Sequence, residues 1–194
     1  MRARQKRLPR ECPYVGKGGL KLEFALREFR IKVNGLVTAD LGCHVGGFTD
    51  CLLQHGAARV YAVDTAYGVL AWKLRRDPRV VVLERTNALY WHPPEPVNLV
   101  VADLGWTKQE KSLPAAASMV RPGGVVLSLL KPQYECPRAW LRRGVLDPAR
   151  LPEVMQMVRT VIPATLCLEA EAPSPLRGSG GNVEVWLMLR HRNV

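Results

Sequence analysis

The chain has 194 residues, of which 47% are hydrophobic and 23% charged, as expected for one globular domain with its own hydrophobic core. Its apolar runs are far shorter than the roughly 20 residues that span a bilayer, and its basic N-terminus lacks the apolar segment of a secretory signal, so we predict a cytoplasmic protein. The formal net charge of +11 favours a polyanionic partner, of which nucleic acid is the commonest.

Basic residues dominate the start of the chain, where the first ten positions contain no acid. We predict that residues 1–13 form a basic arm and that residues 14–194 form one folded domain. Such an arm would become ordered on phosphate groups. The arm residues predicted to contact nucleic acid are Arg2, Arg4, Lys6, Arg7 and Arg10.

Short apolar runs alternate with amphipathic stretches along the rest of the chain, after a first predicted helix over residues 19–29. Strands are predicted over residues 37–41, 59–63, 80–83, 97–102, 125–130, 164–170 and 183–189. Further helices are predicted over residues 46–55, 69–75, 113–120 and 152–161. Proline and charge cluster in residues 132–148, which we interpret as a loop or lid, and residues 174–181 as a flexible loop.

Strands of nearly continuous valine, isoleucine and leucine that alternate with helices indicate a parallel sheet covered on both faces. The last two strands, near the C-terminus, are predicted to form an antiparallel hairpin at one edge. The expected fold is a doubly wound, Rossmann-like α/β sandwich with about seven strands.

A glycine-rich loop follows the first predicted strand in the sequence DLGCHVGGF, residues 40–48. Gly42 and Gly46 allow the backbone to approach a ligand closely. Their spacing does not favour a pyrophosphate, and S-adenosylmethionine (SAM), a nucleotide-like cofactor without phosphate, suits it better. Asp40 would balance positive charge on that cofactor, and Asp64, at the end of the next strand, would accept hydrogen bonds from a ribose diol. The alternative is a structural turn in an unrelated α/β protein.

Other polar groups near the carboxyl ends of the strands complete the predicted cofactor site, since ligands of open α/β sheets bind there. Asn87 would reach an adenine ring or simply cap a turn, and His44 would make a polar contact in the loop. The predicted cofactor-binding residues are Asp40, Gly42, His44, Gly46, Gly47, Phe48, Asp64, Asn87 and Asp103.

Asp103 and Lys131 each follow an apolar strand, and parallel neighbours would bring them to the same edge of the sheet. A lysine in that position would serve as a general base or stabilise an alkoxide, or the two residues would form a structural ion pair. Lys21 on the first helix and Glu184 in the last strand are weaker candidates, since a solvated lysine and an acid on an edge strand are ordinary features.

The five cysteines are odd in number and have no C-x-x-C spacing, which indicates reduced thiols in a cytosolic protein. Cys51 and Cys167 lie in apolar stretches and are expected in the core. We predict no structural metal.

Several segments together resemble one family. These are YVGKGGLKLE from Tyr14, the run from Asp40 to Gln54, VYAVD ending at Asp64, ERTN ending at Asn87, and LKPQYE from Leu130. They look like the TlyA subgroup of the FtsJ-like RNA 2′-O-methyltransferases, over nearly the whole chain from residue 14. The resemblance implies the class I SAM-dependent methyltransferase fold, and methyl transfer from SAM to a ribose 2′-hydroxyl of RNA, ribosomal RNA above all. It also implies a catalytic tetrad of Lys21, Asp103, Lys131 and Glu184.

The chain also differs from the pattern of that subgroup. Members carry an N-terminal S4 RNA-binding domain where this chain has only the basic arm, and they have Ser-Arg where this chain has Gly16-Lys17, so Lys17 joins the predicted RNA-binding residues. Cys43-His44-Val45 and Leu104-Gly105-Trp106 replace the usual residues beside the cofactor and the aspartate. Two alternatives therefore stay open: a non-catalytic SAM- or RNA-binding protein associated with ribosomes, and a class I methyltransferase with another substrate.

Overall fold

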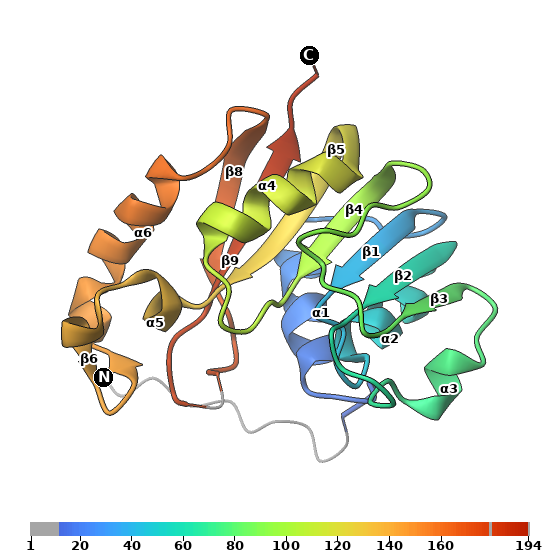
Figure 1. Ribbon diagram of the computed structural model, residues 1–194, viewed down its shortest axis with the longest axis horizontal. Coiled ribbons are helices and arrows are strands. Elements are labelled where there is room, and N and C mark those ends of the chain that lie inside the picture. The colour runs from blue at the N-terminus through green and yellow to red at the C-terminus, as the bar shows by residue number, and fades with distance from the viewer. Residues whose placement is uncertain (1–11, 179, 194) are drawn as a thin grey trace.

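A computed structural model describes residues 12–178 and 180–193, in which seven strands form one twisted sheet (Figure 1). The strand order is β3-β2-β1-β4-β5-β9-β8. The strands are β1 (Val37–Leu41), β2 (Arg59–Val63), β3 (Val80–Leu83), β4 (Val97–Ala102), β5 (Val120–Leu130), β8 (Leu166–Pro173) and β9 (Val185–His191). The first five pair in parallel, and β9 is antiparallel to both β5 and β8. The predicted doubly wound sheet with an antiparallel C-terminal hairpin is confirmed.

Helices cover both faces of this sheet (Figure 1). The helices are α1 (Gly18–Glu28), α2 (Gly47–Gln54), α3 (Trp72–Arg75), α4 (Gln109–Met119), α5 (Pro132–Glu135) and α6 (Leu151–Thr160). One core cluster lies between the sheet and α1, α2 and α3, and the other lies between the sheet and α4 and α6.

The strand sequences explain why both faces are covered. In β4, Leu99 and Val101 belong to the core under α1 and α2, whereas Val100 and Ala102 belong to the core under α4. Successive side chains of a strand point to opposite faces, so a strand that is buried on both faces is apolar at most of its positions. Burial on both sides therefore explains the valine- and leucine-rich runs of this chain.

The first helix, α1, packs against the core mainly through one strip of buried side chains. Leu22, Ala25 and Leu26 are fully buried, whereas Leu20 and Phe24 are only half-buried at the edge of the contact. Helical positions three and four residues apart share one face, and Leu22, Ala25 and Leu26 keep that spacing.

Several boundaries also differ from the predictions. The helix expected over residues 69–75 is confined to α3, and β5 begins at Val120 with an irregular register opposite β4. Glu184 precedes β9 and does not interrupt it. Cys51 is buried as expected, but Cys167 is exposed, because its side chain lies on the open face of the edge strand β8.

The segment predicted as a loop or lid, residues 132–148, has regular structure. It contains α5, the 3₁₀ turn η1 (Arg138–Trp140) and a two-stranded hairpin of β6 (Leu141–Arg142) and β7 (Val145–Leu146), and the 3₁₀ turn η2 (Pro148–Arg150) follows. The arm residues predicted to bind RNA, Arg2, Arg4, Lys6, Arg7 and Arg10, lie outside the described residues. None of the helices in the described part of the chain has the length and apolar character needed to cross a membrane.

Candidate active site

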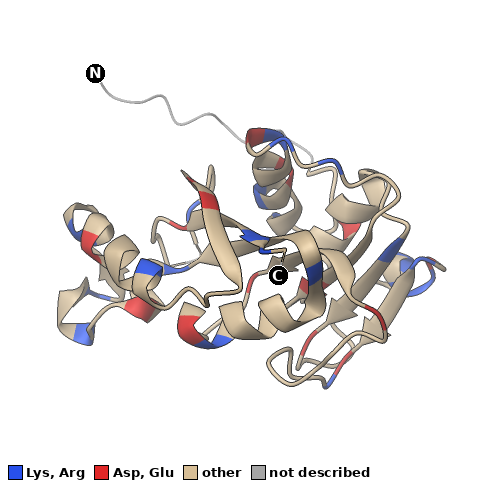
Figure 2. Cartoon of the chain, turned by 90° about the horizontal axis from the view of Figure 1, so that it is seen from above, with Lys and Arg blue, Asp and Glu red and all other residues tan. Residues whose placement is uncertain are grey.

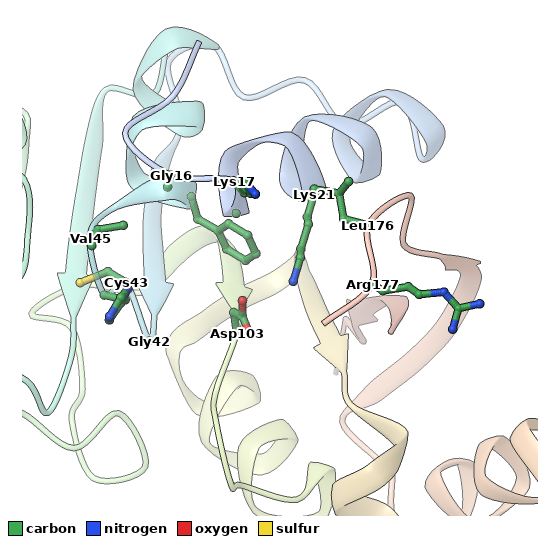
Figure 3. Close-up of a pocket in the computed structure, with 13 residues that line it drawn as sticks. Gly16, Lys17, Lys21, Gly42, Cys43, Val45, Asp103, Leu176 and Arg177 are labelled. Carbon is green, nitrogen blue, oxygen red and sulfur yellow. The ribbon is translucent and has the colours of Figure 1, made fainter. Parts of the chain in front are cut away.

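Two cavities open at the carboxyl ends of the parallel strands. The first cavity, of about 600 Å³, lies between the start of α1, the loop after β1 and the loop before β9 (Figure 3). The second cavity, of about 550 Å³, lies among the loops that follow β1, β2, β3 and β4. Gly42, His44 and Asp103 line both cavities, so these residues form the boundary between them.

Gly42 brings the ends of β1 and β4 together. Its φ of 84° lies in the left-handed region, and a Cβ at this position would lie 2.5 Å from the backbone oxygen of Asp103. Only glycine accepts both conditions without strain. The backbone amides of Gly42 and Cys43 donate to the carbonyl oxygen of Val63 at 2.9 and 3.2 Å, which fixes the loop against β2. The glycine therefore holds Asp103 at the boundary of the two cavities.

The next two glycines have different surroundings. Gly46 has a φ of 97° and precedes α2, and a Cβ there would lie 2.2 Å from Cδ1 of Leu74. It lines neither cavity, so packing against the segment of α3 explains this glycine. Gly47 lines the first cavity and packs against the backbone of residues 16–19. Phe48 also lines that cavity, and its ring lies 5.5 Å from the ring of Trp186.

Asp40 lies in the core beneath this loop and is fully buried, so it forms no part of either cavity wall. Thr49 donates a hydrogen bond of 2.6 Å to its Oδ2, whereas its Oδ1 has no hydrogen-bond partner among the described residues. Burial raises the pKa of Asp40 to about 7, with smaller contributions from the carboxylates of Asp103 and Asp64. A buried carboxylate oxygen without a partner fits a positively charged group in the adjoining cavities, as SAM would supply.

The second cavity contains Asp64 and Asn87, as the sequence predicted for neighbouring strand ends. Oδ2 of Asp64 accepts the backbone amide of His44, and Oδ1 accepts that of Ala66, both at 2.8 Å. A carboxylate has about four acceptor positions, so the Asp64 side chain is held in place and still has acceptors for a diol. Oδ1 of Asn87 accepts the amide of Leu89 at 3.0 Å, so this residue caps a turn at the cavity wall.

Four charged residues from distant parts of the chain form a continuous ion-pair chain. Nζ of Lys21, on α1, lies 2.5 Å from Oε2 of Glu184, and Nζ of Lys131, directly after β5, lies 3.3 Å from Oε1 of the same carboxylate. Lys131 also forms an ion pair with Asp103, directly after β4. Figure 3 shows Lys21 extending from α1 into the first cavity toward the end of β4, where Asp103 lies.

The electrostatics of the ion-pair chain centre on Lys131, whose side chain is 13% exposed. Burial alone would lower its pKa, but the carboxylates of Asp103 and Glu184 outweigh burial and raise the pKa above the ordinary value of 10.5. Glu184 is 3% exposed and lies between the two lysines, which compensate its buried charge. The ammonium form of Lys131 is therefore the resting form at neutral pH.

Glu135 was missed by the sequence interpretation, although it ends the LKPQYE segment. Its Oε1 accepts the backbone amide of Gln109 at 2.8 Å, at the N-terminus of α4, and Ser128 donates to Oε1 of Gln109 at 2.8 Å. Burial raises the pKa of Glu135. These contacts tie α4, β5 and α5 together around the loop that begins at Asp103. Only its place after Lys131 in the segment signalled this role.

The first cavity also contains residues that the sequence did not single out. Leu176 and Arg177 come from the loop between β8 and β9, opposite Lys17 and Lys21 on the α1 side (Figure 3). In the second cavity the exposed ring of Trp106 stacks on Tyr134, with ring centroids 5.1 Å apart. Within residues 12–178 and 180–193, no group of three or more His, Cys, Asp or Glu side chains is placed to hold a metal ion.

Comparison with known proteins identifies the family. The sequence model of the FtsJ-like methyltransferases matches residues 14–185. The chain belongs to the FtsJ-like methyltransferase family. Within it, the 16S/23S rRNA (cytidine-2′-O)-methyltransferase TlyA of Mycobacterium tuberculosis is 42% identical over 186 residues, which cover 93% of this chain and 69% of TlyA. YqxC of Bacillus subtilis is 39% identical over 91% of this chain, and the match spans only 65% of the length of YqxC.

Solved structures share the fold of this chain. A candidate hemolysin from Streptococcus thermophilus superimposes with a TM-score of 0.91 at 34% identity, over 96% of this chain and 70% of that one. The N-methyltransferase NodS of Bradyrhizobium japonicum, in complex with S-adenosyl-L-homocysteine, has a TM-score of 0.59 at 16% identity, over 93% of this chain and 82% of NodS. This second likeness shows the shared methyltransferase fold.

Proposed function

We propose that this chain is a SAM-dependent methyltransferase that modifies a ribose 2′-hydroxyl of ribosomal RNA in the cytoplasm. The ion-pair chain of Lys21, Glu184, Lys131 and Asp103 carries this proposal, because it runs from the first cavity, lined by Lys21 and Asp103, to the second, lined by Asp103 and Lys131. The similarity to TlyA, which is named as an rRNA 2′-O-methyltransferase, supports the choice of substrate. The net charge of +11 suits a polyanionic substrate.

We assign the cofactor to the boundary of the two cavities. Asp64 and Asn87 would hold its nucleoside in the second cavity, and Gly42, Gly47 and Phe48 would border its amino-acid part. The carboxylates of Asp64, in the second cavity, and Asp103, at the boundary, suit a cationic ligand. When bound, SAM supplies a methyl group that its sulfonium already activates, so the protein chiefly has to orient the hydroxyl.

The residues of the ion-pair chain would act on the hydroxyl oxygen. The N–H groups of Lys131 would donate to that oxygen and stabilise the negative charge that develops on it while the hydroxyl proton passes to a solvent water molecule. Asp103 and Glu184 hold Nζ of Lys131 in position through their ion pairs, and Lys21 holds Glu184 from the other side. Since the pKa of Lys131 is raised, its ammonium suits charge stabilisation better than proton abstraction.

The test compares Lys131→Ala with Lys111→Ala, which removes an exposed lysine from α4 as a matched control. Each full-length protein is incubated with ribosomal RNA and methyl-labelled SAM, and ribose methylation is mapped by mass spectrometry. We expect Lys131→Ala to lose about 10²–10⁴-fold in rate, the range for one well-placed acid–base or charge-stabilising group, while Lys111→Ala matches the wild type.

The Lys131→Arg variant distinguishes a loss of activity from a loss of folding. Arginine keeps the positive charge that Glu184 and Asp103 require but places it at a different position. This variant should bind SAM normally in calorimetry and remain nearly inactive. Equal ribose methylation by Lys131→Ala and Lys111→Ala would refute the assignment.

A further inference from the structure

The short hairpin between α5 and α6 is part of a basic segment that the candidate active site does not use. This basic hairpin, defined as residues 136–150, contains four arginines and one acid, Asp147. The Asp147 carboxylate accepts the amide of Ala149 at 3.0 Å and so caps η2. The arginines are Arg138, Arg142, Arg143 and Arg150.

Three arginines of the basic hairpin have no acidic partner among the residues that the structure describes. Arg150 contacts Glu153 at 3.2 Å and lies over the ring of Trp140, but Arg138, Arg142 and Arg143 are exposed and pair with no carboxylate of the described residues. Arginines on nearby elements behave differently: in α6 and β9 they pair with glutamates of the edge strand β8. Figure 2 shows acidic and basic residues interspersed along the helices and strands of the chain. The basic hairpin thus presents uncompensated positive charge.

The turn of the hairpin places an arginine where the backbone disfavours one. Arg143 and Gly144 form the two-residue turn with φ values of 51° and 80°. Such turns favour asparagine or aspartate followed by glycine. A left-handed conformation costs an ordinary L-residue roughly 1–2 kcal/mol. Residues with strained backbone are frequent at functional sites, so the strain at Arg143 supports a functional role for its guanidinium group.

A buried asparagine joins the basic hairpin to the candidate active site. Asn182 is 3% exposed; its Oδ1 accepts the amide of Leu146, and its Nδ2 donates to the carbonyl of Gly144, both at 2.9 Å. Its backbone oxygen accepts the amide of Gly178 at 3.0 Å. Asn182 stands two residues before Glu184, so the hairpin is fixed to the loop that borders the first cavity. Figure 1 shows the hairpin and this loop at the same end of the sheet.

We propose that the basic hairpin binds the sugar–phosphate backbone of the RNA that flanks the target nucleotide. Arginine binds phosphate oxygens with two parallel hydrogen bonds, and such contacts position the RNA without reading its sequence. The rigid link through Asn182 then sets the distance between the bound backbone and the ion-pair chain. This inference rests on the proposed function and adds the surface that orients the substrate.

The experiment uses the full chain and a double variant, Arg142→Gln with Arg143→Asn. Asparagine tolerates the left-handed turn and therefore preserves the hairpin. The matched control, Arg76→Gln with Arg121→Gln, removes the same charge from exposed positions outside the hairpin, at the end of α3 and at the start of β5. Binding of a fluorescein-labelled 20-base-pair RNA duplex of mixed sequence is followed by anisotropy between 0.05 and 0.3 M salt.

We expect the hairpin variant to bind the duplex about 10- to 100-fold more weakly at 0.1 M salt. The slope of log K against log salt should become shallower by about 1.8, since each lost phosphate contact accounts for about 0.9. The control should stay within about threefold of the wild type. Equal weakening in both variants, an unchanged slope, or a wild type that does not bind the duplex would each overturn the proposal.

Ribose methylation separates this inference from the proposed function. Hairpin-dependent RNA binding without any methylation of ribosomal RNA would overturn the proposed reaction and leave the docking site standing. The opposite result is methylation that depends on Lys131 together with RNA binding that the hairpin substitutions do not change. It would overturn only the proposal that the hairpin binds RNA. A sequence-dependent loss, confined to one RNA duplex among several, would also contradict a contact made to the backbone.

Discussion

The two cavities at the carboxyl edge of the sheet are assembled from the chain in different ways. The second cavity is walled by loops that directly follow parallel strands, from Gly42 after β1 to Asp103 after β4. The first cavity joins α1 to the loop between β8 and β9, so that Lys21 contacts Glu184 across 163 positions of sequence. A parallel sheet brings strand ends together by its topology, whereas the first cavity depends on packing of both chain ends.

This difference indicates that the two cavities have different functional roles. The second cavity offers fixed acceptors, such as Asp64 with both oxygens held by backbone amides, and suits a cofactor of constant shape. The first cavity offers Lys21, held by Glu184, and a border of basic residues, and suits the reacting part of a polyanion, while Lys131 faces the second cavity beside the boundary residue Asp103. Changes in the ion-pair chain should therefore affect the reaction, and changes at Asp64 in the second cavity should affect cofactor affinity.

The largest effect is expected from Glu184→Gln. The change removes the charge that compensates both Lys21 and Lys131, so Lys131 loses its fixed position. We expect methyl transfer to ribosomal RNA to fall by about 100-fold or more, with SAM affinity within about twofold of the wild type. The matched control is Glu169→Gln, which breaks an exposed ion pair with Arg190 and should leave both quantities unchanged. A Glu184→Gln variant with an unchanged methylation rate and a reduced affinity for SAM would contradict the roles assigned here.

A smaller effect is expected from Asp64→Asn in the second cavity. Asparagine keeps the size of the side chain but replaces one acceptor oxygen with a donor, which removes a charge-assisted hydrogen bond worth about 1.5–3 kcal/mol. SAM affinity in calorimetry should fall about 10- to 100-fold, while the methylation rate at saturating SAM changes little. Asp77→Asn, at an exposed ion pair with Arg79, is the control. A large loss of rate at saturating SAM would contradict the assignment of Asp64 to the cofactor alone.

The smallest effect is a pH dependence of cofactor affinity that arises from Asp40. Burial raises its pKa from 3.8 to about 7, so the folded protein holds a proton there in slightly acidic solution. A cationic ligand nearby favours the ionised form and must displace that proton, so SAM should bind several-fold more weakly at pH 6 than at pH 8. In Asp40→Asn the affinity should be the same at both values. Calorimetry in two buffers of different ionisation enthalpy would also detect the released proton, and no release would contradict the prediction.

The raised pKa of Asp40 also makes the stability of the folded protein depend on pH. Below pH 3.8 the Asp40 carboxyl is protonated in both folded and unfolded chains and has no effect. Between pH 3.8 and about 7 the unfolded chain ionises while the folded one does not, so the contribution of Asp40 to stability becomes increasingly unfavourable and then levels off. For Lys131, whose pKa is raised, the stabilising contribution is complete below pH 10.5 and is lost only in more alkaline solution. The two groups therefore titrate in separate ranges.

The sequence by itself determined the sheet and the second cavity. Apolar runs specify strands that are buried on both faces, and parallel strands necessarily place Asp64 and Asp103 at one edge. It also supplied the four residues of the ion-pair chain, though only through resemblance to a family, because nothing local distinguishes Lys21 or Glu184 from solvated charges.

The tertiary structure alone decided which charged groups are in contact and why Gly42 and Gly46 must be glycine. Three features depend on packing between distant segments. They are the contact between Lys21 and Glu184, the packing of Gly46 against Leu74, and the hydrogen bonds from Asn182 to the hairpin. The segment expected to be a loop became an ordered basic hairpin for the same reason: hydrogen bonds to a distant asparagine stabilise strands of only two residues. Sequence patterns record local periodicity and strand order, whereas the shape and charge of the first cavity come from contacts between segments that the chain brings together only when it folds.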